Sequence, residues 1–78
     1  MDLEAESLAL VQADRDINEG KERIERQRKI IEQLRSGGHD TTDAVRLLST
    51  LEDTLTAMMQ HRSLIVARIA QWKSGILT

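Results

Sequence analysis

The sequence predicts an all-α protein: two long antiparallel helices that form a helical hairpin, which dimerises with a second copy into a four-helix bundle. Three observations support this. Apolar residues recur at alternating steps of three and four in the second half of the chain and at every seventh position in the first half, the period of helices packed along one seam. One cluster of helix-breaking residues, Ser36 to Asp40, separates the halves. The 78 residues include no proline, which suits helices throughout.

The first predicted helix runs from about residue 3 to about residue 36. On its seam, the stripe that faces the partner helix, an apolar residue stands at every seventh position: Leu3, Leu10, Ile17, Ile24 and Ile31. The positions between them are mostly small or polar: Glu6, Ala13, Gly20, Gln27 and Leu34. A neighbouring helix can therefore approach closely.

The predicted loop covers residues 37–40. Gly37 and Gly38 favour a left-handed helix end followed by a tight reversal. Asp40 or Thr41 can cap the next helix. Because the second helix restarts within a few residues, the two helices are expected to be antiparallel neighbours.

The second predicted helix spans residues 41–74, and apolar residues fill every position of its seam except Arg62: Ala44, Leu48, Leu51, Leu55, Met58, Arg62, Ile65, Ile69, Trp72 and Ile76. Matching the two seams antiparallel gives pairs whose numbers add to 78 or 79, from Leu34 with Ala44 to Leu3 with Ile76. The sizes are complementary, since Gly20 faces the long Met58. Near the ends, Glu6 is expected to accept the indole N–H of Trp72, and Ile76 to fold back toward Trp72.

The second helix has more apolar surface than one partner helix can cover. A single two-helix unit also has too little interior for a sizeable core, so residues 1–78 are expected to form one domain that dimerises. The predicted interface is Val45, Leu47, Leu51, Met58, Met59, Ile65, Val66 and Trp72.

Charge is distributed unevenly along the first helix. Residues 1–20 are acidic and residues 21–35 are basic, which favours an antiparallel dimer. A patch of Arg23, Arg26, Arg28 and Lys29 could bind phosphates. The stronger interpretation is a solvated face with pairs four residues apart, Glu22 with Arg26 and Glu25 with Lys29. The net charge of -2 and the lack of interleaved aromatics also weigh against nucleic acid.

Three polar residues are expected to set register or oligomer specificity: Arg62, Gln27 and His61. Two hypotheses for Arg62 stay open. It pairs with Asp14 or Asp16 at a similar height on the first helix, or it extends outward over apolar neighbours.

No catalytic residue, metal site or cofactor is predicted, and the chain is not expected to be an enzyme. It has no cysteine, and its two histidines, His39 and His61, are too far apart along the chain to share a metal. The most apolar stretch, Leu64 to Trp72, is too short to cross a membrane, and no signal peptide is apparent, so a cytoplasmic location is expected.

The chain resembles a group of short, functionally uncharacterised bacterial helical-hairpin proteins. The resemblance rests on these residues: Ile17, Gly20, Ile24, Gln27, Ile31, Gly38, Asp40, Thr41, Ala44, Leu48, Leu51, Glu52, Leu55, His61 and Arg62. It implies a bacterial, cytoplasmic protein and brings no activity, ligand or catalytic residue.

The functional prediction is a non-catalytic, self-associating interaction module that serves as an adaptor, regulator or assembly element, with an unidentified protein partner left open. The alternative is a nucleic-acid-associated protein that uses the basic face from Lys21 to Arg35. A third hypothesis places a ligand or metal site inside the bundle, built from Arg62 or His61 of two chains.

Overall fold

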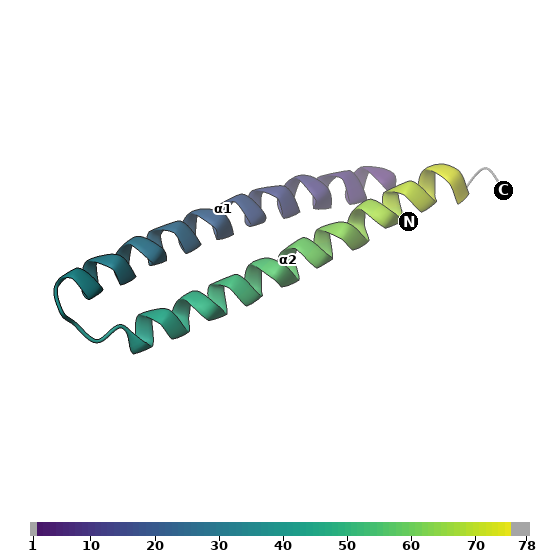
Figure 1. Ribbon diagram of the computed structural model, residues 1–78. Helices are drawn as coiled ribbons and strands as arrows, with labels where there is room; N and C mark the ends of the chain where they lie inside the picture. Colours follow the sequence, from purple (N-terminus) through teal and green to yellow (C-terminus); the bar gives the residue numbers. More distant parts are fainter. Residues whose placement is uncertain (1, 76–78) are drawn as a thin grey trace.

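The computed structural model describes residues 2–75 and consists, over that range, of two helices without strands. Helix α1 spans Leu3–Ser36 and helix α2 spans Thr42–Gly75. They lie side by side, joined by a loop at one end, in a rod of 63 × 15 × 12 Å (Figure 1). The all-helical fold is as predicted, and α2 begins and ends one residue later than expected. The predicted pairing of Leu3 with Ile76 and the predicted fold-back of Ile76 toward Trp72 both involve Ile76, which lies outside the described residues.

Local hydrogen bonds define both ends of α1. The Asp2 carboxylate accepts the backbone N–H of Glu4 at 3.0 Å and so caps the start. At the other end, Gly38 donates to the carbonyl of Arg35 and His39 donates to that of Leu34. These two hydrogen bonds form only when the residue after the helix end adopts the left-handed conformation. Gly38 adopts it, with a φ of 74°. The glycine pair therefore ends the helix as predicted, and Gly38 is the residue that reverses the chain.

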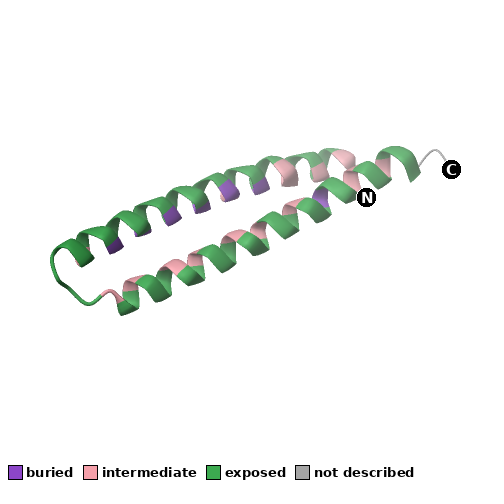
Figure 2. Cartoon of the chain, in the orientation of Figure 1, coloured by how far each residue is buried: buried purple, intermediate pink, exposed green. Residues whose placement is uncertain are grey.

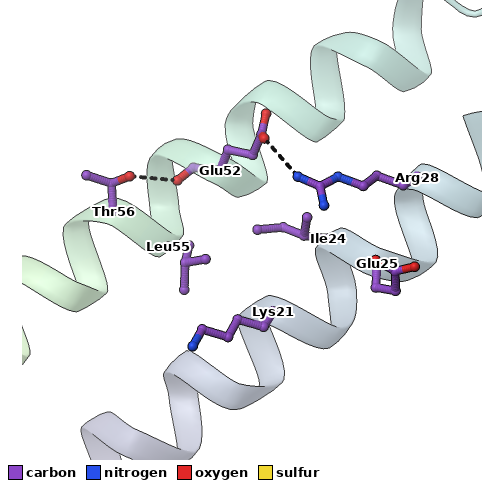
Figure 3. Close-up of a pocket in the computed structure, with 7 residues that line it drawn as sticks. All are labelled: Lys21, Ile24, Glu25, Arg28, Glu52, Leu55 and Thr56. Atoms are coloured by element: carbon purple, nitrogen blue, oxygen red, sulfur yellow. Dashed lines mark hydrogen bonds and ion pairs between the residues drawn. The ribbon is translucent and has the colours of Figure 1, made fainter.

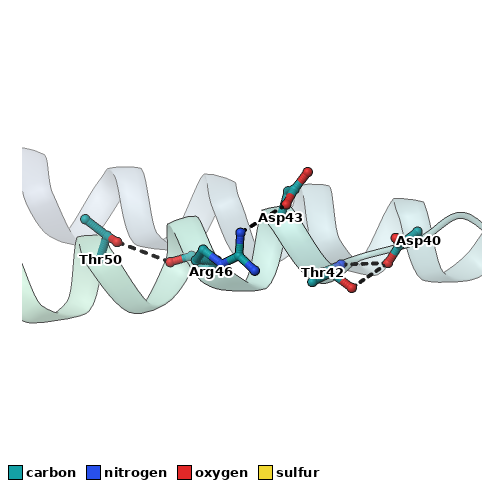
Figure 4. A network of polar contacts seen from close by, with 5 residues as sticks. All are labelled: Asp40, Thr42, Asp43, Arg46 and Thr50. Atoms are coloured by element: carbon teal, nitrogen blue, oxygen red, sulfur yellow. Dashed lines mark hydrogen bonds and ion pairs between the residues drawn. The ribbon is translucent and has the colours of Figure 1, made fainter.

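A short polar network starts α2 (Figure 4). The carboxylate of Asp40 accepts the hydroxyl of Thr42 at 2.7 Å and its backbone N–H at 2.9 Å. The Thr42 hydroxyl and, next, its N–H lower the pKa of Asp40 below its ordinary value of 3.8. One turn further on, Arg46 donates to Asp43 at 3.5 Å.

The buried residues lie along the sides of the two helices that face each other (Figure 2). On α1 the buried residues follow the predicted seam: Ala13, Ile17, Gly20, Ile24, Gln27 and Ile31. On α2 only Ile65 is buried, with 0% of its surface exposed. The remaining described seam residues of α2 are only half-buried, because α1 covers one side of them. The hairpin is thus one layer thick.

The central pair of the predicted register is confirmed. A Cβ atom at Gly20 would lie 2.9 Å from Met58 Cε and 3.5 Å from Leu55 Cδ1. Because Gly20 has no side chain, the end of the long Met58 side chain can pack against the backbone of α1 at this position.

Candidate functional site

Ion pairs link the helices in a complementary pattern. The acidic first half of α1 reaches the second half of α2, through Arg62 Nε with Asp14 Oδ1 at 2.5 Å and Arg68 Nε with Glu6 Oε2 at 3.3 Å. The basic half of α1 reaches the first half of α2, through Arg28 with Glu52 at 3.5 Å. The charge asymmetry of α1 is therefore partly balanced inside the hairpin, which weakens its use as an argument for dimer orientation.

In the described part of the chain, two predicted ion pairs are absent and one predicted hydrogen bond is replaced by an ion pair. Within residues 2–75, neither Glu22 with Arg26 nor Glu25 with Lys29 forms an ion pair. Such exposed pairs contribute only a few tenths of a kcal/mol, so the side chains are weakly held. Glu6 accepts from Arg68 and not from Trp72, because a guanidinium offers the carboxylate a charged donor.

Arg62 combines the two hypotheses made for it. It pairs with Asp14 and not with Asp16, while 42% of its side chain stays exposed to solvent. It therefore lies at the edge of the seam, and its charge avoids full desolvation.

Gln27 is the buried polar residue of the core, with 7% of its surface exposed. Its Nε2 donates to the backbone carbonyl of Ala44 at 2.9 Å. Ala44 lies about two turns nearer the loop than Leu51, the residue expected opposite Gln27. The side chain of Gln27 thus reaches along α2 and ties the second half of α1 to the start of α2.

The hairpin has two broad faces, one on each side of the seam. On the ion-paired face, defined by Asp14, Lys21 and Arg28 of α1 and Glu52, Met59 and Arg62 of α2, polar side chains border two shallow hollows. Figure 3 shows one of them, where Arg28 reaches across to Glu52 beside Leu55 and Ile24.

The opposite side is the His61 face. Its central hollow, about 250 Å³, is lined by Ala13, Asp16, Thr54, Ala57, Met58 and His61. Asp14 and Asp16 are two residues apart, as are Met59 and His61, and two residues turn a helix by about 200°. Each pair is therefore divided between the two faces.

The predicted interface residues do not form one surface. Ile65 is buried within the hairpin, and Leu51, Met58 and Trp72 are half-buried in the seam. The exposed interface residues lie on different faces according to their position around the helix. Val45, Met59 and Val66 are spaced by multiples of seven and share the ion-paired face. Leu47 lies on the His61 face with Ala57 and Leu64. The sequence prediction named residues beside the seam without assigning each to a side. Leu64, which was not among the predicted residues, is also exposed on the His61 face, seven residues from Ala57.

The predicted basic patch is also divided. Arg23, Arg26 and Lys29 follow one another at steps of three and lie on one exposed side of α1. Arg28 is turned toward α2 and bound to Glu52. Three cations, and not four, share a surface.

Residues 2–75 contain no cluster of three or more His, Cys, Asp or Glu side chains that could hold a metal ion. His39 lies in the loop against Gly37, while His61 borders the hollow midway along α2. Neither described helix has a stretch long and apolar enough to span a membrane.

Comparison with protein-family models, with curated proteins and with solved structures finds no match for this chain. The resemblance to bacterial helical-hairpin proteins, and the cytoplasmic location that it implies, stay predictions.

Proposed function

We propose that the chain is a non-catalytic, self-associating helical-hairpin module that serves as an adaptor, regulator or assembly element. One observation carries the proposal. Helix α2 buries only Ile65, although large apolar residues stand exposed along its length: Val45, Leu47, Met59, Leu64 and Val66. An apolar helix covered on one side only is typical of a component that completes its core with another chain.

The energetics favour a second layer of helices. Fully burying one large apolar side chain contributes roughly 1.5–3 kcal/mol, and half-buried seam residues such as Leu51 and Leu55 realise only part of that. Stable helical domains pack at least two layers around a core. A second hairpin would supply the missing layer from the same sequence.

Sedimentation equilibrium and thermal melting at several protein concentrations test this proposal. We expect a dimer at micromolar concentration and a Tm that rises with concentration, because association stabilises the folded chain. A monomer at roughly 100 μM with a concentration-independent Tm would overturn the proposal.

Nucleic-acid binding is the second candidate. Arg23, Arg26 and Lys29 are exposed on one side of α1 and make no ion pair within residues 2–75. Such a surface would bind duplex DNA or RNA through phosphates, with affinity that falls steeply as salt rises. Absence of a mobility shift at low salt would contradict it, and so would a shift unchanged when all three cations are replaced by glutamine.

A further inference from the structure

Building on the proposed self-association, we propose that the His61 face is the dimer interface, and that the second copy lies on it about a two-fold axis at mid-hairpin. The two loops then point to opposite ends of the bundle. The axis passes beside Gly20 and Met58, the central pair of the hairpin.

Desolvation separates the two faces. A partner on the ion-paired face would remove solvent from Asp14 with Arg62 and from Arg28 with Glu52, pairs whose side chains are 42–56% exposed. Taking charged groups out of water costs several kcal/mol per ion before any attraction is counted. The His61 face has one such cross-helix pair, Glu6 with Arg68 near the open end, against two on the ion-paired face.

Between Leu47 and Leu64, the His61 face of α2 is a continuous stripe at helical spacing. It runs through Leu47, Thr50, Thr54, Ala57, His61 and Leu64, with no Asp, Glu, Lys or Arg among them. The hydroxyls of Thr50 and Thr54 donate to backbone carbonyls one turn earlier, at 3.3 and 2.9 Å. Burial of this stripe would therefore leave neither hydroxyl without a hydrogen-bond partner. Its small central residues allow a second helix to come close.

The stripe is complementary to itself. With the axis at mid-hairpin, Leu64 comes level with the partner's Thr54, at the edge of the partner's central hollow, and His61 comes level with the partner's Ala57. Because a two-fold axis repeats each contact, Leu64 of each chain would fit against the central hollow of the other chain.

Charge on α1 agrees with the same axis. Asp16 and Arg23 lie seven residues apart on the His61 face, almost equally far from Gly20 on its two sides. The two-fold axis therefore brings Arg23 of each chain level with Asp16 of the other chain. Within the described chain Arg23 makes no ion pair, and Asp16 accepts only the amide of Gln12. Two ion pairs would thus form across the interface.

Lysine substitution of two nearby residues tests the choice of face. Leu64 is 59% exposed on the His61 face, and Val66 is 40% exposed on the ion-paired face. Since lysine suits an exposed helix, both variants should keep their helical circular dichroism. Leu64→Lys is expected to weaken the dimer at least about tenfold in sedimentation equilibrium, and Val66→Lys to leave it within about threefold.

The controls separate the two proposals. A dimeric wild type broken by Val66→Lys and not by Leu64→Lys would overturn the face and leave self-association standing. A monomeric wild type would overturn both.

Single cysteines test the orientation directly, because the chain has none of its own. Ala57 lies on the His61 face close to the axis, and its neighbour Thr56 lies on the ion-paired face. On mild oxidation Ala57→Cys should give a disulfide-linked dimer, since residue 57 lies close to the axis in both copies, whereas Thr56→Cys should stay unlinked. Equal linkage of both variants, or linkage of Thr56→Cys alone, would overturn the arrangement.

Discussion

Gly20 and Met58 meet at the centre of the hairpin, where a Cβ atom on Gly20 would lie 2.9 Å from Met58 Cε. The contact involves the flexible end of the methionine, so Gly20→Ala should change stability little: better helix propensity, worth up to about 1 kcal/mol, offsets a small shift of Met58. Gly20→Ile should destabilise by about 1–3 kcal/mol, because its branched side chain needs the space that Met58 fills.

Urea unfolding of the double variant checks that cause. Met58→Ala should cost less in the Gly20→Ile background than in the wild type, because it vacates the contested space. An equal cost in both backgrounds would show that the two side chains do not compete.

Gln27→Glu should destabilise the hairpin by about 1–3 kcal/mol at neutral pH. The new carboxylate would be buried against the Ala44 carbonyl, to which Gln27 now donates. Burial would raise the pKa of this glutamate above its unfolded value. The lost stability should therefore return as pH falls toward about 4.3 and disappear again as pH rises.

Gln27→Leu is the matched control, since it removes the amide and leaves no unpaired polar side chain in the core. It is expected to stay within about 1 kcal/mol of the wild type at all pH values. A Gln27→Glu variant as stable as the wild type at pH 7 would show that the Ala44 contact does not matter.

The Asp14 and Arg62 pair should contribute only about 0.2–1 kcal/mol, because both side chains are about half exposed. A double-mutant cycle with Asp14→Asn and Arg62→Met measures this coupling, which should shrink further in 1 M salt. A coupling above about 2 kcal/mol would indicate a more deeply buried pair, as expected if a partner covered the ion-paired face.

Asp40 should make stability depend on acid pH. Because its folded-state pKa is lowered by the Thr42 hydroxyl and N–H, its contribution is fully present above the unfolded value of 3.8. The contribution is lost as pH falls through the folded pKa. Thermal melts of the wild type and Asp40→Asn from pH 7 to pH 2 test this, since asparagine keeps the acceptor and does not titrate. Parallel curves across the whole range would contradict the assignment.

The sequence predicted the helices well because their signals are local. The seven-residue spacing of the α1 seam and the adjacent glycines determine where the helices lie and end, and the pairing of Gly20 with Met58 followed from the steady spacing of both seams. The contacts made by long side chains were predicted less well. Whether Arg62 takes Asp14 or Asp16 depends on the rotation of α1, and Gln27 reaches a carbonyl about two turns from its expected seam partner. Neither choice is visible in the apolar pattern.

Burial is distributed unevenly along the rod. No residue from 2 to 12 or from 66 to 75 is buried, whereas burial on α1 continues from Ala13 to Ile31 and the loop closes the far end. Separating the two helices at the open end therefore exposes little apolar surface, while separating them between Ala13 and Ile31 exposes most of it. The hairpin should breathe from the open end, with amide protons near its termini exchanging with solvent long before those around Ile24. In a single chain the two helices are thus held together at the reversal and are loosest at the opposite end, where α1 begins and α2 ends.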